Sequence, residues 1–107
     1  MQLKTFDALF IEVVEECFVD VLGKEAAVTI FQYLENHKGL SRDRMSHDIV
    51  VVHNSLLNLL GSMTFLLESY VIRILIQKLQ IPIEDQPKNS FPDRIETIKN
   101  YLNNKGT

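Results

Sequence analysis

The hydrophobic pattern of this chain is helical almost throughout, and its most apolar stretch covers residues 62–79. Apolar side chains in this stretch recur at steps of three and four, which is the spacing of one helix face: Met63, Leu66, Leu67, Tyr70, Val71, Ile74, Leu75 and Leu79. Three more apolar residues widen the face until only a narrow polar strip remains: Phe65, Ile72 and Ile76. A helix that is apolar nearly all round is a bundle centre, half of a dimer interface or a membrane span. We expect the first two roles together.

Two further helices with recognisable ends precede this stretch. The first covers residues 6–22, where Thr5 or Asp7 can cap the amino end and Gly23 stops the helix. The second covers residues 25–37 and also ends near a glycine.

The third helix is expected to run from a cap at Ser46 to Leu60, after a polar connection. One short helical turn in this connection begins at Ser41 and points Met45 inward. The β-branched run at residues 49–52 has strand propensity, but its apolar continuation to Leu60 is too long for a single strand.

The carboxyl-terminal part begins with residues 81–89, which hold two prolines and are predicted to form an exposed linker. Ser90, Pro92 and Asp93 then follow the order of a helix start, with a cap, a first-turn proline and an acid. The fifth helix has a narrow apolar stripe of four residues: Ile95, Ile98, Tyr101 and Leu102.

These elements predict an all-α fold, a small bundle of four core helices in residues 1–81. Residues 82–107 are expected to form a linker and a C-terminal amphipathic helix that docks on the core or on a partner. With 107 residues, 46% of them apolar, the chain is large enough to bury one core without disulfides or metals.

The charge is acidic and uneven. The whole chain carries −3, and residues 1–40 alone carry −4. Nucleic-acid binding normally needs a basic surface, so this balance disfavours DNA or RNA as the main partner.

The compartment is expected to be the cytoplasm. Cys17 is the single cysteine and has no intramolecular partner, which fits a reducing environment. Residues 1–7 show no signal-peptide hydrophobic region. Arg73 near the middle of the apolar stretch would cost about 3 kcal/mol in a bilayer, so we predict no membrane span.

The sequence shows no recognisable catalytic motif. His47 and His53 are six residues apart and face different sides of a helix, so they are expected to be surface or capping residues rather than metal ligands. Cys17 lies in an apolar stripe, where a thiol is a poor nucleophile. Five acids of the first helix could attract a divalent cation, although a solvated face is the commoner role: Asp7, Glu12, Glu15, Glu16 and Asp20. We therefore expect a non-enzymatic protein without catalytic residues, cofactor or metal.

Glu68 and Arg73 are the most informative charges because the helix around them is so apolar. Five residues apart, they do not face each other, so each needs a partner elsewhere or a solvated groove. Either both reach water along the edge of the bundle, or Arg73 pairs across a two-fold dimer with acids of the first helix or with the second copy's Glu68. The predicted interface consists of Phe65, Glu68, Ile72, Arg73 and Ile76.

An alternative is a helix-turn-helix regulator of transcription. Residues 27–45 followed by 56–60 have the cadence of a winged helix-turn-helix, and Arg42 and Arg44 are suitably basic. The recognition helix would then include residues 49–55, which have no Arg or Lys to meet phosphates, and no strand pair for a wing follows.

The order of motifs resembles a small all-helical output-domain family of archaea, typified by ammonia-oxidising lineages (a Nitrosopumilus-type output domain). The segments that carry the resemblance are Val21–Glu25, Ile30–Glu35, Leu56–Gly61 and the helix with Glu68, Ile72, Ile76 and Leu79. It covers about residues 6–81. Family members have Phe-Gly-x-Gly-Ala where this chain has Leu60–Thr64, which lacks the second glycine and the alanine. The resemblance implies a regulatory or interaction role and carries over no site residues. Together with the apolar stretch, it predicts a signalling output or protein-interaction module that acts through helix–helix association with a protein partner, and a homodimer is the expected form.

Overall fold

The computed structural model describes residues 5–86 and 88–105, and in this part of the chain every regular element is a helix. The elements are α1 (Phe6–Leu22), α2 (Lys24–Lys38), a six-residue 3-10 helix η1 (Arg42–His47), α3 (Ile49–Leu60), α4 (Met63–Leu79) and α5 (Phe91–Lys105). The all-α fold class is confirmed.

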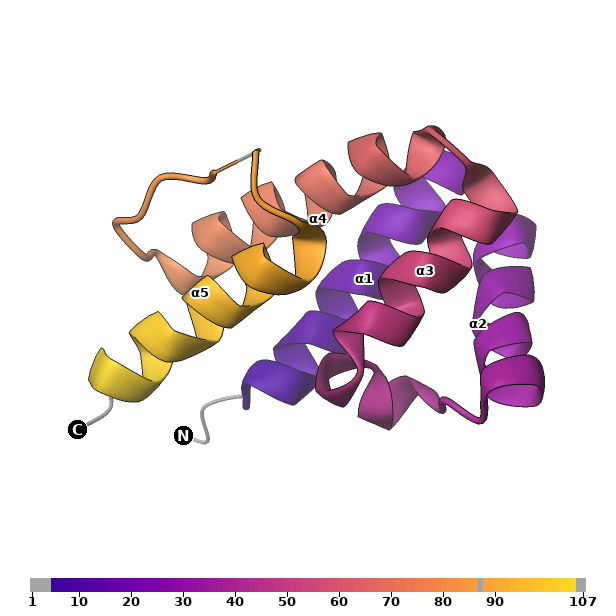
Figure 1. The fold of residues 1–107 in the computed structure, drawn as a ribbon, viewed down its shortest axis with the longest axis horizontal. Helices are drawn as coiled ribbons and strands as arrows, with labels where there is room; N and C mark the ends of the chain where they lie inside the picture. The colour runs from indigo at the N-terminus through magenta and orange to yellow at the C-terminus, as the bar shows by residue number, and fades with distance from the viewer. Residues whose placement is uncertain (1–4, 87, 106–107) are drawn as a thin grey trace.

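α1 is the central element of the bundle, since it packs against α2, α4 and η1. α3 contacts both α4 and α5, and α5 also lies against α4. Figure 1 shows α1, α2 and α3 as one group, from which α4 leads away to meet α5 beside it. The buried apolar side chains of all five α-helices form one core cluster, with Phe10, Phe18, Leu34, Leu56, Leu67, Leu75 and Ile95 among the largest.

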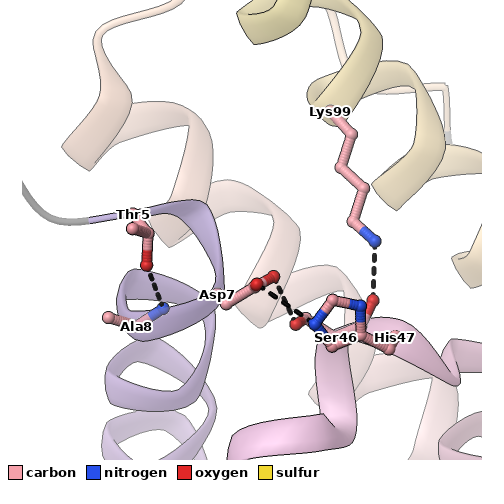
Figure 2. Close-up of polar contacts among 6 residues, drawn as sticks. All are labelled: Thr5, Asp7, Ala8, Ser46, His47 and Lys99. Atoms are coloured by element: carbon pink, nitrogen blue, oxygen red, sulfur yellow. Dashed lines mark hydrogen bonds and ion pairs between the residues drawn. The ribbon is translucent and has the colours of Figure 1, made fainter.

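Most helix ends follow the capping expected from the sequence. Thr5 Oγ1 accepts a hydrogen bond from the Ala8 amide at 3.2 Å, as Figure 2 shows. Ser90 Oγ does the same for the Asp93 amide at 3.2 Å. Gly39 ends α2 with φ 62°, a left-handed conformation that favours glycine.

The expected cap at Ser46 is wrong. Ser46 belongs to η1, its side chain is fully buried, and its Oγ donates to Asp7 Oδ1 at 2.5 Å. The Lys99 amine on α5 donates to the Ser46 carbonyl at 2.6 Å (Figure 2). A side chain held by α1 cannot also cap α3, so this serine instead ties η1 to α1 while its carbonyl ties η1 to α5. The predicted inward position of Met45 is confirmed.

The orientation of α4 differs from the expected one. Leu67, Val71 and Leu75 are buried as predicted, whereas Leu66 is 63% exposed and Met63 is 42% exposed. The reason is that α1 and α3 cover one side of α4 and α5 covers a second side, which leaves the Leu66 side open.

The C-terminal helix docks on its own chain. Phe91, Ile95 and Ile98 join the core cluster, and Ile81 of the linker is buried beside them rather than exposed as expected. Arg94 fastens α5 to the linker, because its Nε and Nη2 donate to Asp85 at 2.8 and 2.5 Å.

Among the described helices, none combines the length and apolarity that a bilayer crossing requires.

Candidate interaction surface

Four of the exposed large apolar side chains lie where α3 passes into α4. Phe65 is 58% exposed, and Leu59, Met63 and Leu66 are also exposed. Isolated apolar residues are common on protein surfaces, but a group of them on one corner is typical of an interaction site.

The outward side of α4, here called the α4 outer face, consists of Met63, Leu66, Tyr70, Arg73 and Gln77. These residues are half-buried or exposed and recur at steps of three, four, three and four. This is the spacing with which one helix meets another in a coiled coil. The face is about 21 Å long, taking 1.5 Å per residue.

A groove runs along this face. It has a volume of about 520 Å³, and one wall is formed by Ile76 of α4 and by Ile83 and Asp85 of the linker. Leu66, Ser69, Tyr70, Arg73 and Gln77 complete its lining. The linker therefore shapes the surface next to α4, which its sequence gave no reason to expect.

Charges on the α4 outer face and its border are of opposite sign. The Arg73 guanidinium lies 5.5 Å from the centre of the Tyr70 ring, and the Tyr70 hydroxyl donates to Asp20 Oδ2 at 3.1 Å. This hydrogen bond to a carboxylate raises the pKa of Tyr70, since the phenol is held in its protonated form. Farther along, Lys78 lies 3.8 Å from Glu16. A cation on α4 is thus bordered by the acidic residues of α1.

The predicted interface residues separate into two groups. Phe65 and Arg73 are exposed, and Ile76 is half-buried in the wall of the groove. Glu68 and Ile72 are only 2% and 1% exposed, so placing them on a contact surface is wrong. Ile72 lies on the side of α4 against which α5 packs. Glu68 lies at the contact between α4 and α3, where its carboxyl has a partner inside the chain.

That partner is His53 of α3, whose Nδ1 lies 2.5 Å from Glu68 Oε2. Burial raises the pKa of the Glu68 carboxyl, while the hydrogen bond and charge of His53 and the charge of Arg94 oppose the rise. His53 is therefore not the surface or capping residue that the sequence predicted. A carboxylate on an almost fully apolar helix needs a hydrogen-bond donor, and the sequence could indicate that need. It could not identify His53 as the donor, because that depends on how α3 packs on α4.

A serine, a histidine and an aspartate meet at the amino end of α1, but not as a catalytic triad. Asp7 is the central residue, with Ser46 on one oxygen at 2.5 Å and His47 Nε2 near the other at 3.2 Å (Figure 2). In a triad the histidine must lie between the other two so that it can take the serine proton. The buried Ser46 is also closed to a substrate, so the cluster fixes η1 onto α1.

Cys17 is fully buried in the core, as expected, and burial together with nearby Glu16 and Asp20 raises the pKa of its thiol to about 12. Within the described residues no group of three or more His, Cys, Asp or Glu side chains is arranged to hold a metal ion. The acids of α1 instead contact neighbours in the chain, such as Glu15 with Arg42 at 2.5 Å.

In the segment with the helix-turn-helix pattern, Arg42 is engaged within the chain. Besides its bond to Glu15, Arg42 lies 4.3 Å from the centre of the Phe31 ring. The side of α3 that would enter a groove presents Val50, Asn54 and Asn58. Neither feature provides the phosphate contacts on which such binding depends.

Comparison of the chain with protein-family models, with curated proteins and with solved structures gives no significant match.

Proposed function

We propose that this chain is a non-enzymatic protein-interaction module that acts as a signalling output by associating with a second copy of itself through the α4 outer face. The observation that carries the proposal is the unbroken coiled-coil spacing of that face, combined with the exposure of Leu66 and its neighbours. The cytoplasm is the expected location.

A second copy is the occupant that the residue pattern favours. In an antiparallel pairing with the two-fold axis near Tyr70, Leu66 of each copy lies opposite Arg73 of the other, and Met63 lies opposite Gln77. An isologous contact of this kind uses the same patch on both copies. The face is therefore self-complementary in length and spacing.

Charge complementarity supports the same arrangement. Arg73 is the cation on the α4 outer face, and Asp20 lies at its border, held by the Tyr70 hydroxyl. Pairing about Tyr70 brings Arg73 of one copy toward Tyr70 and Asp20 of the other. Such pairs at the rim of an interface contribute mainly to register and specificity.

Sedimentation velocity over a concentration series tests the proposal. The wild-type chain is expected to shift from monomer to dimer as concentration rises. Leu66→Arg should weaken the dimer by about tenfold or more, because it places a second cation opposite Arg73 of the other copy. Val50→Arg is the matched control, since Val50 is 55% exposed at the other end of α3.

A charge exchange distinguishes self-association from association with another protein. Arg73→Asp and Asp20→Arg should each weaken the dimer, and the double variant should recover much of the loss. A wild-type chain that stays monomeric at the highest concentrations, or a double variant no better than the singles, would show that the α4 outer face does not pair with itself.

A further inference from the structure

A second cavity, on the other side of Phe65, lies among α3, α4 and the start of α5. Its volume is about 300 Å³, and its lining includes His53 from α3, Phe65 and Glu68 from α4, and Phe91 and Arg94 from α5. This volume is at the lower end of the range for small-molecule sites in proteins. This cavity and the groove on the α4 outer face have only Ser69 in common.

The buried pair of Glu68 and His53 forms part of the cavity wall. Glu68 is the carboxylate in the lining, and its Oε2 already lies 2.5 Å from His53 Nδ1. Burial raises the pKa of the Glu68 carboxyl, while its hydrogen bond to His53 and the charge of Arg94 oppose the rise. The carboxyl group of the wall is thus already hydrogen-bonded within the chain.

The other polar groups of the lining are hydrogen-bond donors or can act as donors. Arg94 is only 7% exposed and is held in place by Asp85 and by Ser69, whose Oγ lies 3.5 Å from Nη2. These bonds use Nε and Nη2 of a guanidinium that has five N–H donors. Lys88 adds an exposed ammonium group at the rim, and Asn89 adds an amide.

The apolar part of the lining is aromatic. Phe91 is buried, whereas Phe65 is exposed and its ring lies 6.4 Å from the His53 ring in an edge-on arrangement. Two phenyl rings in a cavity with a buried arginine and a lysine at the rim match a ligand with a flat apolar part and an anionic end.

We propose that this cavity binds a small carboxylate that carries an aromatic ring, with the carboxylate toward Lys88 and Arg94 and the ring between Phe65 and Phe91. The one carboxyl group of the wall is already hydrogen-bonded to His53, and Arg94 and Lys88 supply N–H donors, so an anion is favoured over an amine. Binding here does not depend on the proposed self-association.

Titration of the full chain with benzoate, followed by ¹⁵N-resolved NMR, tests the proposal at a protein concentration below dimerisation. Saturable shifts are expected at the amides of residues around His53, Phe65 and 88–91. Benzylamine, which keeps the ring and reverses the charge, should bind at least tenfold more weakly. Inorganic phosphate, which lacks the ring, should also bind more weakly than benzoate.

Lys88→Gln is the variant of choice because Lys88 is exposed and its loss leaves the core intact. It should weaken benzoate binding about five- to tenfold, as expected for one hydrogen bond of ordinary strength at an exposed site. Lys24→Gln, an exposed lysine at the start of α2, is the matched control and should leave the affinity unchanged. Absence of saturation with benzoate, equal binding of benzylamine or phosphate, or full affinity in Lys88→Gln would each overturn the proposal.

Discussion

Replacing His53 with leucine would leave Glu68 buried without its hydrogen-bond partner. Glu68 is 2% exposed, and His53 Nδ1 lies 2.5 Å from its Oε2. Leucine keeps an apolar side chain of comparable bulk at the α3–α4 contact, so the main loss is electrostatic. A carboxylate left charged and unpaired in a protein interior costs about 3–5 kcal/mol.

The carboxyl can limit this cost by taking up a proton. From an ordinary pKa of 4.5, protonation at pH 7 costs about 3 kcal/mol, at 1.36 kcal/mol for each pH unit. We therefore expect His53→Leu to lower the free energy of unfolding by about 3 kcal/mol at pH 7. At pH 5 the same protonation costs about 0.7 kcal/mol, so the loss should be much smaller there.

The direction of this pH dependence follows from the raised pKa of Glu68. A carboxyl whose pKa is higher in the folded state stabilises the fold fully at pH values below its unfolded pKa. That stabilisation is lost as the pH rises through the folded pKa. The hydrogen bond and charge of His53 lower the pKa of Glu68 in the folded state, so removing His53 raises that pKa further. The loss of stability with rising pH then continues toward neutral pH.

Urea denaturation at pH 5, 6 and 7, followed by circular dichroism, measures the effect. The double variant His53→Leu with Glu68→Leu is the control, since replacing both partners by apolar groups is expected to be nearly neutral and independent of pH. A loss below about 1 kcal/mol that is equal at pH 5 and pH 7 would refute the account of the buried pair.

Three further outcomes are expected. Leu67→Ala should lower the free energy of unfolding by about 3–4 kcal/mol in chemical denaturation, because Leu67 is fully buried. Leu66 is the neighbouring residue and is largely exposed, so Leu66→Ala should lower it by less than about 0.5 kcal/mol at concentrations where the chain is monomeric. Cys17, whose burial raises its pKa to about 12, should react with a thiol reagent at pH 8 only after denaturant is added, and rapid reaction of the native chain would contradict its burial. Gly39→Ala should cost about 1–2 kcal/mol in the same denaturation assay, because φ is 62° although no atom lies within 4 Å of the added Cβ, and Gly39→Asn should cost less.

The sequence by itself determined the helices and, apart from the start of α3, their approximate ends. The helical period located α1, α2, α3 and α4 to within a few residues, and capping chemistry located the starts of α1 and α5. Local effects were sufficient because a cap, a glycine with positive φ and a helical stripe each depend on residues a few positions apart. The burial of Cys17 followed from its stripe for the same reason.

Only the tertiary structure decided which way α4 faces. Apolar residues occupy almost the whole circumference of this helix, so the helical spacing does not show which side faces the core. Leu66 and Ile72 would both fit a core position. The packing of α1, α3 and α5 buries Ile72 and leaves Leu66 and Phe65 exposed. The exposed surface that supports the proposed function is thus what the neighbouring helices fail to cover.

The buried polar pair was decided in the same way. Glu68 and His53 are fifteen residues apart on different helices, and no spacing rule connects them. The sequence indicated that a charge on so apolar a helix needs a partner, but the partner is whichever donor the α3–α4 contact brings within hydrogen-bond distance. Long-range contacts of this kind depend on the relative placement of whole helices, which local sequence does not encode.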